Sequence, residues 1–207
     1  MKAGILDYGA GNLRSLANAL CACGHEPVIV SAPGEIAGVT HLLLPGQGEF
    51  SDCVGRLEER GLALLLKEWI ANGRPYFGIC VGYQILFDGS EEAPGAAGLG
   101  IFRGTVRRLI AGAGKKIPHM GWNGVSPVSP DAGCWAGLGS EPYFYYVHSY
   151  VPEPLDASVI AARTTYGDET FAAAIQSGSV LACQFHPEKS QDAGLRLISN
   201  FLSIPTS

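Results

Sequence analysis

Short apolar runs alternate with amphipathic segments in the N-terminal part of the chain. The runs lie at Ala3 to Asp7, Pro27 to Val30, His41 to Leu44 and Pro75 to Ile79. Continuous apolar runs of this length are typical of strands that are buried on both faces of a parallel sheet. We therefore predict a β-strand at each place, with helices packed on both faces of the sheet.

Two segments between these runs have helical periodicity. In the first, apolar residues recur across positions 13–20, Asn12 precedes them as a capping residue and Gly24 follows as a stop. In the second, the apolar residues of positions 62–70 fall on one helical face, and Gly73 follows them. The order of elements predicted so far is strand, helix, strand, strand, helix and strand.

The pattern changes after about Gly98. Further strands are predicted at Ile101 to Leu109, Ala157 to Thr165, Thr170 to Gln176 and Val180 to Gln184. The middle two form a hairpin around Gly167-Asp168, and a helix near Ala193 to Leu202 follows the last strand. The Gly- and Ala-rich stretch from Asp88 to Gly100 is expected to be a surface loop. No linker divides the chain, so we expect a single α/β domain over residues 1–207 with a mainly parallel, mixed central sheet flanked by helices.

Composition excludes several classes of protein. Of 207 residues, 47% are apolar and 16% charged, and the net charge of −5 argues against nonspecific nucleic-acid binding. We expect neither a signal peptide nor a membrane span. The six cysteines form no C-x-x-C pair, which argues against a zinc site and fits a reducing cytoplasm. No metal or other cofactor is expected.

The stretch Gly78-Ile79-Cys80-Val81-Gly82 has the pattern of a nucleophile elbow. In such an elbow a tight turn between strand and helix exposes a reactive side chain, and flanking glycines leave room for it. A helix beginning near Gly82 would direct its positive end at the sulfur and favour the thiolate. The alternative is that Cys80 is a small buried apolar residue at the end of a strand.

A nucleophilic cysteine needs a base and a group that orients the base. His186 and Glu188 follow the last predicted strand two residues apart, so an extended backbone turns both side chains to the same side. Taken alone, this segment could also be an exposed turn. His25 is expected to be exposed and His41 to form local hydrogen bonds. His119 and His148 lie in predicted loops, where we interpret them as shaping or substrate-contacting groups.

Acyl transfer also requires donors for the oxyanion that develops. The backbone N–H of Val81, directly after the cysteine, is one candidate. The loop Pro45-Gly46-Gln47-Gly48, after the third strand, could supply a second. A phosphate-binding loop or a plain turn would have the same two-glycine pattern.

Six segments together carry a resemblance to a known family. They are Asp7 to Ser15, Leu44 to Gly48, Gly78 to Gln84, Pro118 to Asn123, Tyr145 to Tyr150 and Gln184 to Ser190. In this order the chain resembles the class I (triad) glutamine amidotransferases, and within them the glutaminase subunits of imidazole glycerol phosphate synthase, a synthase of histidine biosynthesis. The resemblance implies a flavodoxin-like fold.

The resemblance also implies roles for individual residues. Cys80 would be the nucleophile, His186 the base and Glu188 its orienter, in the hydrolysis of L-glutamine to glutamate and ammonia through a thioester. The residues expected to bind substrate or complete the oxyanion hole are Gly48, Val81, Gln84, Ser149 and Tyr150. A cyclase subunit would receive the ammonia in a heterodimer and release imidazole glycerol phosphate and aminoimidazole carboxamide ribotide. Residues resembling those at that partner's face are Asn12, Met120, Trp122 and Lys189.

The chain departs from the family pattern at Gln47, Val81 and Tyr83, where the family more often has an apolar residue, Leu and Met. Glutaminase activity is expected to be weak until the partner and its ligand bind, which requires a movable loop around Gln47. Three alternatives remain: an amidotransferase that feeds a sugar-modifying synthase, a catalytically silent binding subunit, and a peptidase or other thiol hydrolase on the same fold.

Overall fold

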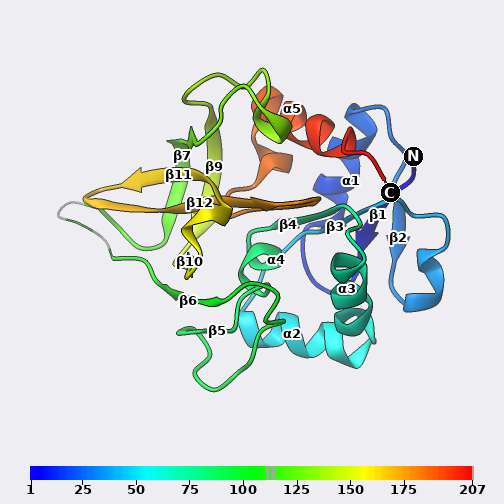
Figure 1. Cartoon of the computed structure of the whole chain (residues 1–207). Coiled ribbons are helices and arrows are strands. Elements are labelled where there is room, and N and C mark those ends of the chain that lie inside the picture. The colour runs from blue at the N-terminus through cyan, green and yellow to red at the C-terminus, as the bar shows by residue number, and fades with distance from the viewer. Residues whose placement is uncertain (111, 113–114, 207) are drawn as a thin grey trace.

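A mixed sheet of eight strands forms the centre of the computed structural model, which describes residues 1–110, 112 and 115–206 (Figure 1). The strand order is β2-β1-β3-β4-β13-β12-β11-β8. The strands are β1 (Ala3–Leu6), β2 (Val28–Val30), β3 (His41–Leu44), β4 (Tyr76–Ile79), β8 (Ser126–Pro127), β11 (Ile160–Tyr166), β12 (Glu169–Ser177) and β13 (Val180–Cys183). Strands β2 to β13 in that order pair in parallel, whereas β12, β11 and β8 continue the sheet antiparallel. The predicted α/β fold with a mainly parallel, mixed sheet is confirmed.

Helices cover both faces of the parallel half, as the apolar runs predicted. Helices α1 and α5 contact each other on one face, and α2 and α3 pack together on the other (Figure 1). Their bounds are α1 (Leu13–Ala22), α2 (Phe50–Glu59), α3 (Leu62–Ala71) and α5 (Gln191–Leu202). Every residue of β1, β3, β4 and β13 is buried, because helices shield both sides of these strands from water.

Local signals in the sequence place the ends of the first helix. The Asn12 side chain accepts a hydrogen bond of 3.1 Å from the Ser15 N–H, which satisfies one free donor of the first turn of α1. Gly24 follows the helix with a φ of +84°, a conformation that favours glycine. Gly73 follows α3 in the same conformation, with a φ of +70°. Both predicted stops are confirmed.

Two smaller sheets lie beyond the antiparallel edge. One has the order β10-β6-β5, and the other pairs β7 with β9. Their strands are β5 (Gly89–Ser90), β6 (Gly104–Arg108), β7 (His119–Gly124), β9 (Tyr143–His148) and β10 (Tyr150–Pro154). The loops predicted around His119 and His148 are therefore wrong, because these residues lie directly opposite each other in the β7–β9 pair. Side chains of β9 alternate between buried and more exposed positions, but aromatic residues occupy both faces and hide that alternation in the sequence.

Three other predictions need correction. Helix α2 was not predicted, although Phe50, Val54 and Leu57 recur at helical spacing and are buried. The stretch from Asp88 to Gly100 is not only a surface loop, because it contains β5 and the buried Leu99. The strand predicted from Ala157 begins instead with the 3₁₀ turn η3 (Ala157–Val159).

Two further 3₁₀ turns lie in the first and second halves of the chain, η1 (Pro33–Ile36) and η2 (Gly133–Trp135). In the part of the chain that the structure describes, no helix combines the length and apolar composition needed to cross a membrane.

Candidate active site

The carboxyl ends of three adjacent parallel strands bring the predicted chemistry together. Strand β3 leads into the loop of Gly46 and Gly48, β4 into Cys80, and β13 into His186. Open α/β sheets bind their ligands at this edge of the sheet. Residues far apart in sequence meet here because β4 lies between β3 and β13.

Cys80 occupies a strained turn between β4 and the short helix α4 (Val81–Gln84), with a φ of +54° and a ψ of −107°. Only 6% of the residue is exposed. A Cβ atom on Gly82 would overlap the Leu44 carbonyl, and one on Gly78 would overlap the Gly82 carbonyl. The tight elbow predicted from the two glycines is confirmed, since a positive φ at a non-glycine residue is costly and is characteristic of functional turns.

Helix α4 is too short to have a substantial macrodipole. It begins at Val81 and comprises four residues, and its first hydrogen bonds run from the Tyr83 and Gln84 N–H groups to the Cys80 carbonyl. The N–H groups of Val81 and Gly82, in the first turn, have no intrahelical acceptor. Individual N–H groups, and not a long macrodipole, are therefore the polar groups that this helix offers to the sulfur.

His186 and Glu188 form a buried pair beside the elbow. The His186 Nδ1 lies 2.8 Å from Glu188 Oε1, and each side chain is 2% exposed. Glu188 lies in the 3₁₀ turn η4 (Pro187–Lys189). A carboxylate only accepts hydrogen bonds, so Nδ1 carries the proton and Nε2 is the atom available to a thiol. Nε2 is buried and has no hydrogen-bond partner among the described residues.

The electrostatics of His186 favour its charged form. Burial by itself lowers the pKa of this imidazole, but the neighbouring Cys80 sulfur and the Glu188 carboxylate outweigh burial and raise the pKa to about 10. An imidazolium between a thiolate and a carboxylate is the arrangement that activates a cysteine nucleophile.

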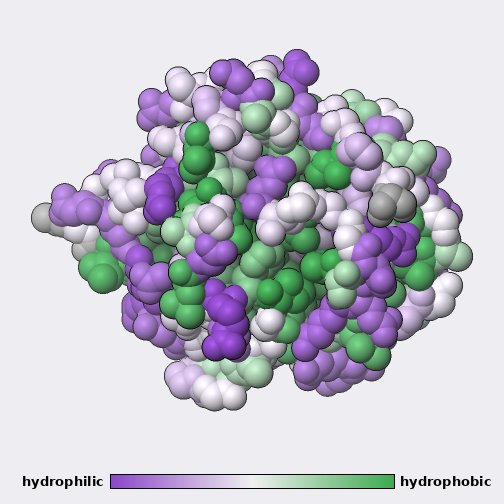
Figure 2. Space-filling model, viewed as in Figure 1, coloured by the Kyte–Doolittle hydropathy of each residue, from purple (hydrophilic) through white to green (hydrophobic). Residues whose placement is uncertain are grey.

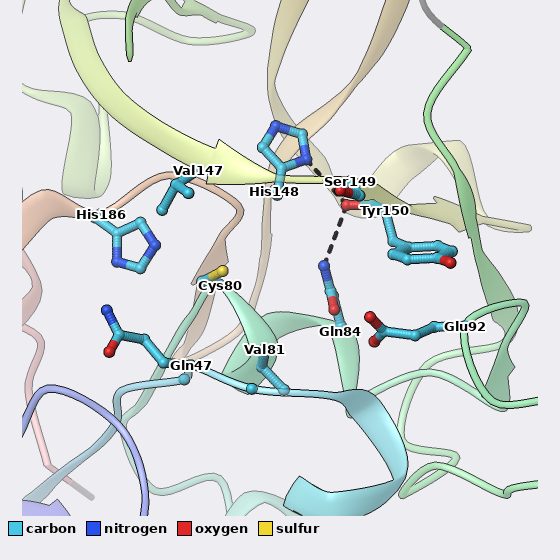
Figure 3. Close-up of a pocket in the computed structure, with 12 residues that line it drawn as sticks. Gln47, Cys80, Val81, Gln84, Glu92, Val147, His148, Ser149, Tyr150 and His186 are labelled. Carbon is cyan, nitrogen blue, oxygen red and sulfur yellow. Dashed lines mark hydrogen bonds between the residues drawn. The ribbon is translucent and has the colours of Figure 1, made fainter. Parts of the chain in front are cut away.

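A cavity of about 280 Å³ opens above Cys80 (Figure 3). Its walls include all five residues predicted to bind substrate or complete the oxyanion hole, namely Gly48, Val81, Gln84, Ser149 and Tyr150. Cys80 and His186 line the same cavity. The sequence therefore predicted a set of residues that the fold does bring together.

Glu92 also lines the cavity and was not predicted. Its Oε2 accepts a hydrogen bond of 3.0 Å from the Phe50 N–H at the start of α2. Partial burial raises the pKa of this carboxyl group, and the bond from Phe50 opposes that rise. The residue was missed because its segment was interpreted as a surface loop, where acidic residues are common.

Two neutral histidines support the cavity wall. His148 lines the cavity, its Nδ1 lies 3.0 Å from the Tyr150 carbonyl, and its Nε2 lies 2.9 Å from His119 Nδ1. Burial is the main cause that lowers the pKa of His148 to about 3 and that of His119 to about 4. Both are poor bases at neutral pH, in agreement with their predicted shaping role.

The other two histidines lie away from the cavity. His41 contacts the Oγ1 of its neighbour Thr40, as predicted for local hydrogen bonding, and also the Ile204 carbonyl, which is far away in sequence. His25 is only partly exposed.

The Gly46 to Gly48 loop packs closely on the elbow. A Cβ atom on Gly46 would lie 2.5 Å from the Gly82 nitrogen, and Gly48 has a φ of +116°. The N–H and the carbonyl of Gln47 both lie 3.4 Å from the Tyr8 hydroxyl. The Gln47 N–H is thus engaged with Tyr8, and the second oxyanion donor stays a prediction.

An apolar face adjoins the cavity on the β7–β9 pair. Met120 and Trp122 are 62% and 47% exposed, and they lie opposite Val147 and Tyr145, respectively. Val147 also lines the cavity, so this face continues to its rim. On the side of the molecule seen in Figure 2, hydrophobic residues gather near the centre, within a more hydrophilic rim.

The other two predicted interface residues lie on neighbouring elements. The Lys189 ammonium lies 5.9 Å from the centre of the Tyr145 ring. Asn12 caps α1, which packs against η4. None of the four residues predicted for a partner's face lines the cavity itself, and their contact with a partner stays a prediction. Across the described ranges, no group of three or more His, Cys, Asp or Glu side chains is placed to hold a metal ion.

Comparison with known proteins defines the class of this molecule. Residues 4–204 match the family described as glutamine amidotransferase class-I, and the chain belongs to that family. A solved structure titled as a glutamine amidotransferase covers 99% of this chain and 98% of its own, with a TM-score of 0.77 and 25% identity. The structure of PurLQS from Thermotoga maritima, at 21% identity and a TM-score of 0.73 over 97% of each chain, shares the fold.

Curated relatives narrow the family further. Imidazole glycerol phosphate synthase subunit HisH of Synechocystis sp. is 47% identical over 198 residues, which are 96% of this chain and 94% of the relative. The subunit of the same name from Rhodopirellula baltica is 45% identical over 201 residues, 97% of each chain. Within the class, the chain is a member of this HisH group.

Proposed function

We propose that this chain hydrolyses L-glutamine to glutamate and ammonia as the glutaminase subunit of an imidazole glycerol phosphate synthase. The observation that carries the proposal is the strained Cys80 beside the buried His186–Glu188 pair in one small cavity. Membership of the class-I amidotransferases and the names of the full-length relatives support it. The working unit is the single domain of residues 1–207, and its place is the cytoplasm.

In the resting site the proton of Cys80 Sγ lies on His186 Nε2, as the raised pKa of this imidazole favours. The thiolate then attacks the carboxamide carbon of glutamine, and the oxygen of that group becomes an oxyanion. The Val81 N–H and a donor from the Gly48 loop stabilise this charge. As the C–N bond breaks, the His186 imidazolium gives its proton to the leaving nitrogen, and ammonia departs from a glutamyl thioester.

The second half of the reaction regenerates the cysteine. His186, neutral again and oriented by Glu188, takes a proton from water, and the resulting hydroxide attacks the thioester carbon. The C–S bond breaks, the sulfur recovers the proton from His186, and glutamate leaves. The Glu188 carboxylate stabilises each imidazolium that forms.

The polar groups of the cavity fit the amino-acid end of glutamine. The Glu92 carboxylate is the acidic group of the wall and pairs with the substrate's α-ammonium group. The amide nitrogen of Gln84 already donates to the Tyr150 carbonyl and to Gln184, so Gln84 offers substrate its oxygen. Ser149 and Tyr150 complete the binding site for the α-carboxylate end.

The ammonia passes to a cyclase subunit docked on the apolar face that borders the cavity. Asn12, Met120, Trp122 and Lys189 contact this partner, which forms imidazole glycerol phosphate and aminoimidazole carboxamide ribotide. A sheltered transfer keeps ammonia from protonation in bulk water, where it would lose its nucleophilicity. Exposed Trp and Met at the rim of a cavity are suitable anchors for such a partner.

A glutaminase assay with purified chain tests the proposal. The chain alone should release ammonia slowly, and addition of the cyclase with its nucleotide ligand should increase the rate. Cys80→Ala should abolish turnover in both conditions while the protein stays folded. Full turnover by the folded Cys80→Ala variant would contradict the nucleophile, and full activity without a partner would contradict the coupling.

A further inference from the structure

Two buried glutamines connect the Tyr150 carbonyl to the sulfur of Cys80. Gln84 is 4% exposed and Gln184 is fully buried. Gln184 follows β13, and its N–H donates to the Ala173 carbonyl at 2.8 Å, which holds its backbone in the sheet edge. Buried amides must satisfy both of their ends, so the direction of each can be worked out from its fixed neighbours.

The Tyr150 carbonyl fixes the direction of the first amide (Figure 3). A main-chain carbonyl accepts hydrogen bonds and never donates them, and the amide end of Gln84 that lies 3.1 Å from it must therefore be the NH₂ group. The same carbonyl accepts a second bond from His148 Nδ1 at 3.0 Å. Both lone pairs of the carbonyl oxygen are thus used, and its position is held from two sides.

The direction of Gln84 then determines that of Gln184. The second hydrogen of the Gln84 NH₂ group points to Gln184 at 3.0 Å, so Gln184 must present its oxygen there. Its own NH₂ group is consequently on the other side, where it lies 3.5 Å from Cys80 Sγ. This distance is within the range of a hydrogen bond from nitrogen to sulfur.

We propose that Gln184 is a further catalytic residue, which donates an N–H hydrogen bond to the Cys80 sulfur and stabilises its thiolate. The inference rests on Cys80 being the nucleophile of the proposed function. The oriented chain from Tyr150 through Gln84 to Gln184 gives the donor a fixed direction before substrate binds. His186 supplies a charge to the sulfur, whereas Gln184 supplies a neutral donor that does not titrate.

The groups that face the sulfur distinguish these two contributions. Titratable groups near the sulfur include His186 after β13, Cys183 within β13, Tyr8 after β1 and Cys53 on α2, besides Glu92 and the neutral His148 of the cavity wall. Burial raises the pKa of Cys183 and Tyr8 well above neutral and that of Cys53 to about 12, so these three stay uncharged at neutral pH. His186 is then the one titrating cation among these neighbours, and a change caused by Gln184 can be measured against it.

The test is the pH dependence of Cys80 alkylation by iodoacetamide, with the modified cysteine identified by mass spectrometry. Gln184→Met removes the donor in a side chain of similar length. Gln184→Glu also removes the donor and keeps an acceptor for Gln84, but it adds a negative charge beside the sulfur, so its midpoint should lie above that of Gln184→Met. Losing one hydrogen bond to a charged sulfur should slow alkylation about tenfold at a pH below the midpoint and shift the midpoint upward by about one pH unit. Gln176→Glu, on the neighbouring strand β12, is the matched control and should behave as wild type.

The alkylation assay contains no glutamine, so its result does not depend on glutaminase activity. It can refute the role of Gln184 while the glutaminase proposal stands, and a failed glutaminase assay would leave the alkylation result unaffected. A merely structural role for Gln184 would lower the melting temperature without moving the alkylation midpoint. A folded Gln184→Met variant with the wild-type midpoint would overturn the inference.

A second measurement tests the inference in the unmutated protein, in case the Gln184 variants do not fold. In the unmutated protein labelled with ¹⁵N, the Gln184 side-chain NH₂ resonance should follow the ionisation of Cys80. Its pH dependence should disappear in Cys80→Ala. A resonance that ignores the state of the cysteine would also overturn the inference.

Discussion

Replacing Glu188 with Gln tests the role of the carboxylate behind His186. The substitution keeps the shape of the side chain and removes its charge. It also permits the new amide N–H to donate to Nδ1, which would place the imidazole proton on Nε2. A neutral His186 with its proton on Nε2 cannot accept the proton of Cys80, so both the charge and the tautomer change in the unfavourable direction.

The magnitude follows from the buried 2.8 Å bond between His186 and Glu188. A hydrogen bond to a charged partner contributes about 1.5–3 kcal/mol, which corresponds to a loss of about 10- to 150-fold in kcat. The wrong tautomer adds to this loss. Glu188 does not line the cavity, so the KM for glutamine should change little. Without the carboxylate the pKa of His186 falls from about 10, because burial then acts against the Cys80 sulfur alone.

Steady-state ammonia release in the presence of the cyclase measures both parameters. Glu153→Gln is a suitable control, since its carboxylate is largely exposed and far along the chain from the elbow. A folded Glu188→Gln variant with wild-type kcat, or one whose loss lies entirely in KM, would refute the reasoning.

Three further predictions concern substrate, partner and pH. Glu92→Gln should raise the KM for glutamine about tenfold with a smaller effect on kcat, because it removes the charge opposite the α-ammonium group; a change confined to kcat would contradict that position. Trp122→Ala should weaken the cyclase complex about 30-fold in a calorimetric titration and leave the slow activity of the isolated chain unchanged, since the residue lies outside the cavity; an unaltered Kd would remove it from the interface. In the folded state the pKa values of His119 and His148 are lowered to about 4 and about 3. In the unfolded chain both have the ordinary histidine pKa of about 6.5, so below this pH the unfolded state binds more protons than the folded state. Acidification from pH 6.5 to pH 5 should therefore lower the free energy of unfolding by about 2 kcal/mol for each histidine, as measured by urea titration. The double His119→Gln, His148→Gln variant should lose less stability over this pH range, and an equal loss would contradict the assignment.

The strands of the parallel half of the fold could be predicted because each consists almost entirely of apolar residues. Runs such as Ala3–Leu6 and Val180–Cys183 are apolar throughout and are buried on both faces. The end signals at Asn12 and Gly24 are local, so they need no tertiary information. Such features survive in the sequence alone.

The parts that were missed depend on tertiary contacts. Strand β9 carries aromatic residues on both faces, because one face covers the core while the other borders the cavity and the exposed apolar face. Glu92 lines the cavity and accepts a bond from the Phe50 N–H, on a helix that was itself not predicted. Gln184 acquires a direction only through Gln84 and Tyr150, residues from different elements.

The meeting of the triad lies between these cases. The sequence shows that Cys80 and His186 each follow a buried strand, but it does not show that β4 and β13 are neighbours. That information came from the resemblance to the amidotransferases, and the sheet order explains it physically. Their adjacency at one edge of the sheet brings together the two motifs of the proposed acyl-transfer site.

The most direct measurement is the mapping of a covalent adduct formed by a glutamine-mimicking electrophile in the complex with the cyclase. Peptide mass spectrometry should find one adduct, on Cys80, formed in proportion to the loss of glutaminase activity and suppressed by excess glutamine. Inactivation that accompanies labelling of any of the other cysteines, with Cys80 unmodified, would contradict the account.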